Sequence, residues 1–221
     1  GKIGISNGVL GMYRTEGEID FNGKPLKLND PLSTLKEKIA FVSEDRRDVG
    51  LLLNESIEDN ITVSATRVNG KYLKHYGPIT QIDRKAQQAR ADEMIKELQI
   101  KCTSRKQNTG ALSGGNQQKV CVARALTLEP DMLFVSEPTR GIDIGAKQVL
   151  LNYLVKLNRE QGMTIVVTSS ELKELRTVCD RIAIIADGQI EGILRPDASD
   201  AEFGLSMSGQ YKKLHNEEAE K

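Results

Sequence analysis

Three continuous apolar runs in the second half of the sequence constrain the fold more than any other feature. They are Met132–Val135, Thr164–Val167 and Ile182–Ile185, and helix-length segments separate them. A strand that is apolar on both faces is typical of a parallel sheet covered by helices. Segment 143–160 would connect the first two runs as an amphipathic crossover helix with an apolar face of Ile144, Val149, Leu150, Leu154, Val155 and Leu157. The sequence therefore predicts an α/β fold with a mainly parallel core sheet.

The earlier parts of the chain have two different patterns of polar and apolar residues. These patterns predict two further regions within one domain over residues 1–211. In residues 16–54, the run Glu18–Phe21 alternates polar and apolar residues before an Asn-Gly turn, and Ile39–Val42 follows as a strand with one solvent-exposed face. Residues 55–126 are polar, charged and mainly helical in pattern. We therefore expect an antiparallel β region, a helical region and, in the remainder, the α/β core.

The two ends of the chain carry weaker signals. A short helix is expected from the N-terminus through Gly11. Near the other end, Asp187-Gly188 predicts a hairpin turn that leads from the third apolar run into Gln189–Ile193. The tail 212–221 is too polar to pack, and we expect it to be disordered.

The composition argues against several classes of partner. Lys plus Arg and Asp plus Glu both number 31, so no net charge draws the chain toward nucleic acid or an anionic membrane surface. No apolar run approaches the roughly 20 residues that cross a bilayer.

The three cysteines, Cys102, Cys121 and Cys179, are odd in number and widely spaced, unlike a zinc site or a disulfide framework. We expect them to be small buried apolar residues, and we expect no nucleic-acid partner.

Two linked motifs carry the functional signal: Leu112–Lys119 and, one helix length later, a strand that ends in Ser-Glu-Pro-Thr. Ser113, Gly114 and Gly115 at a helix entry leave backbone N–H groups free to meet an anion, and the helix dipole adds partial positive charge. An isolated Ser-Gly-Gly would also suit an N-cap with a flexible turn. Glu137, at the carboxyl end of a buried strand, is placed to orient or deprotonate water. Together the motifs predict a phosphate site with a catalytic carboxylate.

These motifs resemble those of the ATP-binding cassette (ABC) family, whose signature reads Leu-Ser-Gly-Gly-x-Gln and whose Walker B strand ends in Asp-Glu-Pro-Thr. The runs Phe41–Arg47 and Thr139–Lys147 are similar to the second cassette of bacterial monosaccharide importers, in which two cassettes are fused in one polypeptide. The resemblance covers nearly the whole chain. It implies a P-loop NTPase-like fold whose helical region carries the signature, and it implies ATP and Mg²⁺ as cofactors.

The resemblance also places the start of the chain inside the phosphate-binding P-loop. Gly1 and Lys2 align with the end of that loop and would contact the nucleotide, unless they are arbitrary terminal residues. Ile3 lacks the hydroxyl that would bind magnesium. With most of the loop absent, the fragment by itself is expected to be inactive.

Three further positions depart from the family pattern. Ser136 stands where the Walker B aspartate would hold magnesium, and Ser170 replaces the switch histidine, so the metal ligands of this site are not identified. Glu44 occupies the place of the Q-loop glutamine. There it would contact magnesium or water, or else form an ion pair with Arg46 or Arg47.

By the same resemblance, the nucleotide contacts extend to Asn116 and Gln117 of the signature and to Asp143 of the D-loop, which in the family lies at the seam between two cassettes. Asp143 would also suit the N-cap of the helix that follows, and the two roles can coexist. His75 and His215 lie outside every motif, and we expect them at the surface.

The function implied by the resemblance is that of the C-terminal cassette of a carbohydrate importer, an ATPase within the full complex at the cytoplasmic face of the membrane. Its signature would complete the ATP site of a second cassette, N-terminal in the same polypeptide. The other implied partners are transmembrane permease subunits and, indirectly, a periplasmic or lipid-anchored sugar-binding protein. Two alternatives stay open: a catalytically inactive regulatory nucleotide-binding module, and import of a nucleoside. A cassette ATPase acting on ribosomes or DNA repair complexes would show basic or coiled-coil segments, which are not visible here.

Overall fold

The computed structural model describes residues 2–211, which divide into two compact units. The larger unit is Asn7–Thr168, and the smaller one joins residues 2–6 to residues 169–211. Helix α1 (Lys2–Val9) confirms the short helix expected at the start of the chain. Gly1 and the tail 212–221, which was expected to be disordered, lie outside the described residues. Within the described part, none of the helices combines the length and the apolar character needed to span a bilayer.

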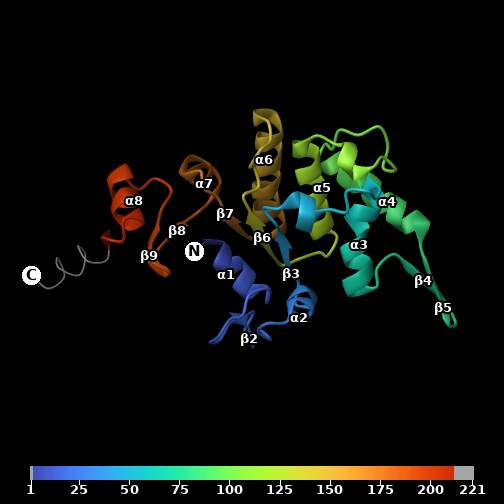
Figure 1. Ribbon diagram of the computed structural model, residues 1–221, viewed down its shortest axis with the longest axis horizontal. Helices are drawn as coiled ribbons and strands as arrows, with labels where there is room; N and C mark the ends of the chain where they lie inside the picture. Colours follow the sequence, from blue (N-terminus) through green and yellow to red (C-terminus); the bar gives the residue numbers. More distant parts are fainter. Residues whose placement is uncertain (1, 212–221) are drawn as a thin grey trace, which may run out of the picture. The chain divides into compact units, whose positions relative to one another are not determined.

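The core of the larger unit is a parallel sheet with the strand order β3–β6–β7 (Figure 1). The strands are β3 (Ile39–Val42), β6 (Met132–Ser136) and β7 (Thr164–Thr168), and β6 pairs with both neighbours. Helix α6 (Ile144–Gln161) connects β6 to β7 and ends at Gly162, whose left-handed conformation favours glycine. This arrangement confirms the α/β fold, the first two apolar runs as parallel strands, and the crossover helix.

Both faces of β3 are covered, which corrects one expectation. Ala40 and Val42 join the main apolar core together with the helices, whereas Ile39 packs in a second cluster with Leu10 and Phe134. The prediction that strand 39–42 belongs to the antiparallel region and has one solvent-exposed face is therefore wrong. A parallel strand takes its neighbour and its cover from residues far along the chain, so a short local window cannot reveal them.

Four helices of the larger unit precede β6. They are α2 (Pro31–Lys36), α3 (Ile57–Asn69), α4 (Arg84–Glu97) and α5 (Gly114–Leu126). The first three begin at side chains that accept hydrogen bonds from the helix backbone, as is typical of N-caps; these are Asp30, Ser56 and Asp83. Helix α5 is buried along most of its length and contributes heavily to the main core. The start of α5 is therefore held by surrounding structure.

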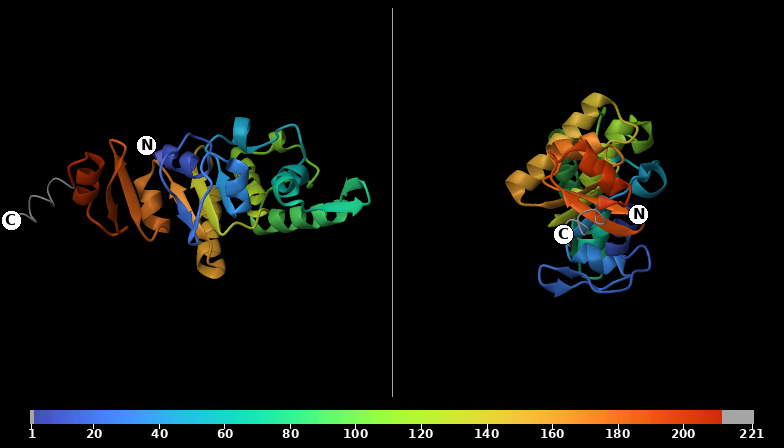
Figure 2. Two further views of the ribbon diagram at one scale, coloured as in Figure 1. Left: turned by 90° about the horizontal axis from the view of Figure 1, so that it is seen from below. Right: turned by 90° about the vertical axis from the view of Figure 1, so that its left-hand side faces the viewer.

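A hairpin of β4 (Leu73–Tyr76) and β5 (Ile79–Ile82) interrupts the helical region and was not predicted. Figure 2 shows it extending beyond the beginning of α4. Its residues are mostly exposed, so the burial pattern that marks a strand is missing, and the turn glycine Gly77 was the one available signal. His75 is exposed on β4, as expected, while His215 lies outside the described residues.

Two predicted hairpins are confirmed, and one strand assignment is wrong. The pair β1 (Asp20–Phe21) and β2 (Lys24–Pro25) lies in the larger unit. In the smaller unit, β8 (Ile182–Ala186) and β9 (Gln189–Leu194) pair antiparallel, accompanied by α7 (Leu172–Val178) and α8 (Asp200–Met207). The third apolar run is therefore not a buried parallel strand. Its alternate residues have different surroundings: Ile182 and Ile184 are buried beside Phe203, while Ala183 is exposed.

Burial tests the remaining single-residue expectations. Cys121 is buried, whereas Cys102 and Cys179 are only partly buried, and all three are free thiols. Ile144 is 86% exposed, so it does not belong to the apolar face of α6, which instead buries Leu150, Leu151, Leu154 and Leu157. Ile144 therefore lies on the solvent-exposed side of the first turn of this helix.

Candidate functional site

Helix α5 begins at the Ser-Gly-Gly motif without a side-chain cap. Ser113 precedes the helix in an extended conformation, and its side chain makes no hydrogen bond to the helix backbone. The hydroxyl of this exposed serine accepts a hydrogen bond from Asn116 Nδ2 at 3.0 Å instead. The N–H groups of the first turn are thus left for an external acceptor. The helix dipole makes an anion the most favourable one.

The two polar residues after the glycines are engaged within the protein. Asn116 Oδ1 accepts a hydrogen bond from the backbone N–H of Lys101 at 2.9 Å, so this side chain braces Ser113 against the preceding loop. Gln117 is 4% exposed, and its Nε2 donates to the carbonyl oxygen of Thr109 at 3.3 Å. The buried side of α5 thus turns this side chain into the protein, and the nucleotide contact of Gln117 stays a prediction.

Gly115 packs against the start of α6 and has no room for a side chain. A Cβ atom at this position would lie 2.8 Å from Ala146 Cβ and 3.4 Å from Asp143 Oδ2. Such a short contact with a rigid methyl group would force the two helices apart. The structure therefore brings together two motifs that the sequence separates by a helix and a strand.

Asp143 caps the start of α6. Its Oδ1 accepts a hydrogen bond from the N–H of Ala146 at 2.9 Å, and this bond is the main reason why the pKa of Asp143 lies below its usual value. The predicted N-cap role is confirmed. The D-loop role stays a prediction, and the exposed position of the carboxylate leaves it available for such a contact.

Glu137 follows the central strand in a constrained turn. It adopts a left-handed φ of 46°, and its N–H donates to the carbonyl oxygen of Thr168 at 2.7 Å. Its own carbonyl oxygen accepts a hydrogen bond from the N–H of Arg140 at 3.2 Å. These bonds hold Glu137 at the carboxyl end of the parallel sheet, where α/β proteins place their ligands. A left-handed conformation in a residue other than glycine is common at functional sites.

Ser136, the last residue of β6, is 1% exposed, and its Oγ accepts a hydrogen bond from Thr168 Oγ1 at 3.0 Å. The two hydroxyl groups therefore form a neutral pair. Across residues 2–211 there is no group of three or more His, Cys, Asp or Glu side chains that could hold a metal ion. Ser136 itself therefore offers a neutral hydroxyl, and not a carboxylate, at this position.

Four predicted positions have no determined place relative to these residues. Gly1 and the side chains of Lys2 and Ile3 lie outside the described residues. Ser170 is exposed and belongs to the smaller unit. The roles assigned to these four residues stay predictions.

The segment after β3 forms a single π-helical turn, η1 (Arg46–Gly50), which Asp45 caps. Arg46 Nη1 donates a hydrogen bond to the carbonyl oxygen of Arg140 at 2.9 Å. In the described structure, no hydrogen bond or ion pair joins the half-buried Glu44 to either neighbouring arginine. The proposed ion pair is therefore not formed, and a nucleotide contact of Glu44 stays a prediction. The contact of Arg46 was missed, because no sequence pattern links it to a residue so far along the chain.

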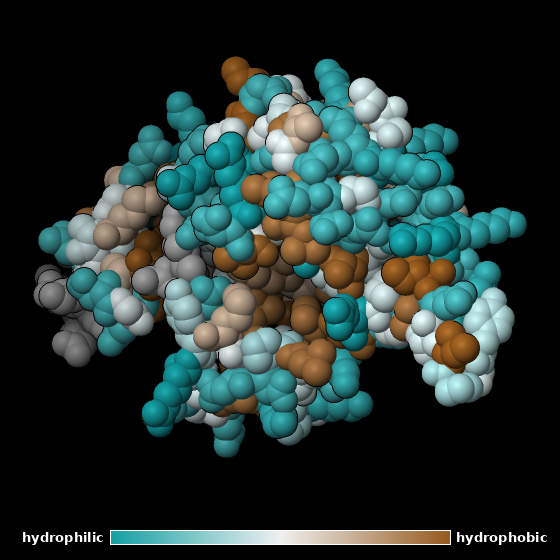
Figure 3. Space-filling model, turned by 45° about the vertical axis from the view of Figure 1, so that its right-hand side comes forward, coloured by the Kyte–Doolittle hydropathy of each residue, from teal (hydrophilic) through white to brown (hydrophobic). Residues whose placement is uncertain are grey.

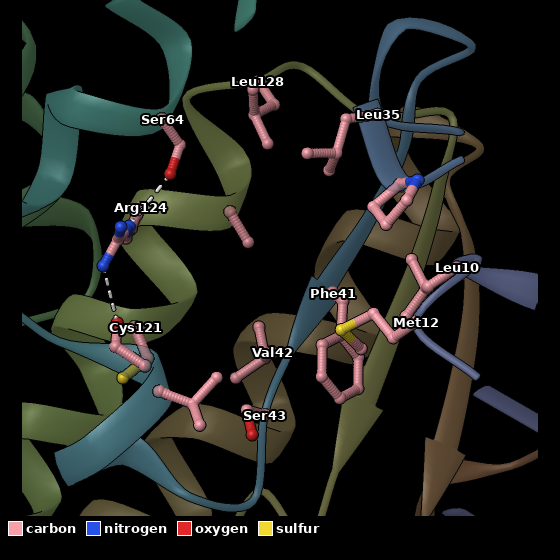
Figure 4. Close-up of a pocket in the computed structure, with 14 residues that line it drawn as sticks. Leu10, Met12, Leu35, Phe41, Val42, Ser43, Ser64, Cys121, Arg124 and Leu128 are labelled. Carbon is pink, nitrogen blue, oxygen red and sulfur yellow. Dashed lines mark hydrogen bonds between the residues drawn. The ribbon is translucent and has the colours of Figure 1, made fainter. Parts of the chain in front are cut away.

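An apolar groove of about 210 Å³ lies beside η1. Figure 3 shows apolar side chains gathered in a hollow on this face, and Figure 4 shows Leu10, Met12 and Phe41 on one side of the groove. Met12 is 43% exposed, and Val49, at the edge of the same groove, is 64% exposed. Such an open apolar hollow suits a partner with apolar side chains.

The other wall of the groove contains a half-buried arginine, Arg124 (Figure 4). Arg124 Nε donates to Ser64 Oγ at 2.9 Å, and its Nη1 donates to the carbonyl oxygen of Gly50 at 2.8 Å. Burial lowers the pKa of Arg124, although an arginine remains charged at neutral pH. Burial also raises the pKa of the neighbouring Cys121 thiol to about 12. The end of η1 is thus attached to α5 at the groove.

Comparison with known proteins gives one family and several relatives. A family model described as ABC transporter matches residues 1–140. The ribose import ATP-binding protein of Lactococcus lactis is 38% identical over 213 residues, which are 95% of this chain and 42% of the relative. The D-allose import ATP-binding protein of Escherichia coli is 38% identical over 206 residues, which are 92% of this chain and 40% of that protein. The chain thus spans about two fifths of the length of these curated relatives.

Solved structures agree with the fold. An ATP-binding cassette solved as a dimer in a post-hydrolysis state, with bound ADP and Pi, superposes with a TM-score of 0.73 at 25% identity. The alignment covers 90% of this chain and 82% of that one. A dimeric bacterial ABC transporter cassette gives a TM-score of 0.72, also at 25% identity and with the same coverage.

Proposed function

The chain belongs to the ABC transporter family, and from this premise we propose that it is an ATP-binding domain that energises carbohydrate import through a membrane permease. In this proposal its Ser113–Gly115 segment completes the ATP site of a second cassette, whose P-loop holds the nucleotide. The observation that carries the proposal is the uncapped start of α5, packed directly against the start of α6. Phosphoryl transfer depends mainly on positioning and on donors arranged in advance around the phosphate.

The local geometry supports a phosphate held between two cassettes. The exposed Ser113 hydroxyl is oriented by Asn116, and Gly115 keeps the backbone of the first turn bare. The two similar solved structures are dimers, which agrees with a site shared by two copies of the fold. In the proposed complex, the second cassette precedes this one in the same polypeptide.

The chain's own site, at the carboxyl end of the sheet, is poorly suited to hydrolysis. Ser136 supplies a neutral hydroxyl, bonded within the protein, where the family has a carboxylate that holds the metal. Glu137 is positioned as a general base, but a base contributes little when the metal and the phosphate beside it are poorly held. Hydrolysis is therefore concentrated at the site with the partner's P-loop, and Mg²⁺ accompanies the nucleotide there.

The groove beside η1 is the proposed docking place of a permease segment. Among the described residues no helix can cross a membrane. In this proposal the membrane passage is provided by a permease. The exposed Met12 and Val49 offer apolar contacts, and the charged Arg124 lies in the opposite wall. Its bond to Gly50 connects the wall of the groove with η1.

The cargo is proposed to be a sugar. The relatives named above are ATP-binding proteins of ribose and D-allose import, and another, from Treponema pallidum, serves galactose and methyl galactoside import at 38% identity. A sugar-binding protein would deliver the cargo to the permease, while this chain lies at the cytoplasmic face. Uptake assays with labelled ribose, galactose and adenosine separate sugar import from nucleoside import.

The decisive experiment uses the full polypeptide and its permease in proteoliposomes. Ser113→Arg places bulk and charge where the γ-phosphate must dock, so we expect ATP-driven uptake to fall to the background while the protein remains folded. The matched control is Ser104→Arg, at another exposed serine of the larger unit. Wild-type uptake by the Ser113→Arg variant would exclude the proposed function.

One observation favours a second candidate. The neutral Ser136–Thr168 pair would also suit a regulatory cassette that engages a partner but supports no hydrolysis in the complex. In that case the assembled complex would bind ATP without steady-state phosphate release. A phosphate-release assay on the same proteoliposomes distinguishes the two candidates.

A further inference from the structure

Arg46 contacts two segments of the larger unit that lie far from it in sequence. Its Nη1 donates to the carbonyl oxygen of Arg140 at 2.9 Å. Its Nη2 lies 3.0 Å from the position that a Cβ atom on Gly114 would take, and 3.5 Å from the Cβ position of Gly141. The guanidinium group thus lies between the first residue of α5 and the loop that follows Glu137.

The half-buried guanidinium group of Arg46 uses only part of its hydrogen-bonding capacity within the protein. Its Nε has no hydrogen-bond partner among the described residues. The hydrogen bond that Arg46 does make joins η1 to the loop that follows Glu137.

The far end of the same turn is attached to the groove. The carbonyl oxygen of Gly50 accepts a hydrogen bond from Arg124 Nη1 at 2.8 Å. At one end of η1, Arg46 lies beside the start of α5. At the other end, Gly50 is bonded to Arg124 in the wall of the groove. Short π-helical turns are frequent at functional sites.

We propose that Arg46 is a positioning residue for the reaction at the partner cassette's ATP site. It holds Gly114 and the Arg140–Gly141 loop in one fixed arrangement, and it ties that arrangement to the position of η1. The inference rests on the proposed function, because the amides of α5 matter for the reaction only if they meet a nucleotide. The partner's P-loop supplies most of the binding to ATP, whereas donors placed in advance act mainly in the transition state. Loosening Arg46 should therefore lower kcat and leave KM nearly unchanged.

The test measures the ATPase kinetics of the full transporter in proteoliposomes. Arg46→Met keeps a long side chain without donors, and we expect kcat to fall about tenfold or more, with KM for ATP within about twofold of the wild type. Arg46→Lys retains a donor for the carbonyl oxygen of Arg140 and should recover part of kcat. The matched control is Arg47→Met at the exposed neighbouring arginine, which should behave as wild type.

Three results would overturn the inference. An unchanged kcat in Arg46→Met would show that the contact does not matter, and a raised KM with unchanged kcat would place Arg46 on the nucleotide itself. A loss explained entirely by fewer active molecules in an active-site titration, with no recovery in Arg46→Lys, would show a purely structural role. Ser113→Arg in the same assay distinguishes a failure of this inference from a failure of the proposed function. If it is inactive while Arg46→Met is unimpaired, only this inference fails; if both keep wild-type rates, the proposed function fails.

Discussion

The hydroxyl of Thr168 donates a hydrogen bond to the hydroxyl of Ser136 at 3.0 Å, across the ends of two neighbouring parallel strands. Ser136 is 1% exposed, so water does not compete for this bond. The pair is neutral and forms without a cation. A carboxylate in the same place would be desolvated and would need a metal or another positive charge.

The first prediction follows from this pair. Ser136→Asp should destabilise the protein by at least about 2 kcal/mol, because it buries a carboxylate without a compensating positive charge. Urea denaturation at pH 7 measures the loss, and the loss should shrink at low pH as the carboxyl group becomes neutral. Thr168→Val, which removes only the donor, should cost about 1 kcal/mol. An unchanged midpoint for Ser136→Asp would mean that a cation reaches this position.

The second prediction concerns the two ATP sites of the assembled transporter. Glu137→Gln should leave most steady-state ATPase activity intact, whereas the equivalent change in the partner cassette should reduce it by about a hundredfold or more. The reason is that Ser136 leaves the site of this chain without a carboxylate for the metal. Equal losses in the two variants would show that both sites hydrolyse ATP in a coupled cycle.

The third prediction tests the groove. Met12→Glu and Val49→Glu place charges on its exposed apolar edge, and we expect each to weaken permease binding by about tenfold or more. Coupled uptake should fall while ATP binding is retained. Ile79→Glu, at a residue of β5 that is 57% exposed, is the matched control. If the control is as damaging as the two groove variants, the groove is not the specific docking place.

The fourth prediction uses the cysteine beside the groove. Burial raises the pKa of the Cys121 thiol to about 12 from an ordinary value of 9.0, so it should stay neutral and unmodified by iodoacetamide at pH 8. The partly buried Cys102 and Cys179 should react first. Because the pKa is raised on folding, the stability due to the neutral thiol is present below pH 9 and is lost as the pH rises toward 12. Peptide mapping after timed labelling measures the order, and early labelling of Cys121 would show that the groove opens readily.

The fifth prediction addresses the core. Leu133 is fully buried in the central strand, so Leu133→Ala should cost about 2–5 kcal/mol in the free energy of unfolding. Leu32→Ala, at a residue that is 50% exposed, should change it by less than about 0.5 kcal/mol. Urea denaturation of both variants provides the comparison. Equal effects would contradict the placement of β6 at the centre of the sheet.

Much of the fold could be predicted from local patterns. The Asn22-Gly23 and Asp187-Gly188 turns gave both of the predicted hairpins, and apolar runs located β6 and β7. The exposed β4–β5 hairpin was missed because it buries too little to leave a pattern. The Ser113–Gly115 motif and Glu137 could be proposed as site residues because short motifs combine a turn, a helix start and a chemical group within a few residues.

The sequence by itself determined what local chemistry encodes: turns, helix starts, apolar runs and the motifs that identify the family. Only the tertiary structure decided which strands pair, since β3 joined the parallel sheet and β8 turned back onto β9. It also decided that Gln117 faces inward and that Arg46 meets the carbonyl oxygen of Arg140. The physical reason is that pairing and side-chain contacts depend on groups supplied by distant parts of the chain. Their positions are set only when the whole core has packed.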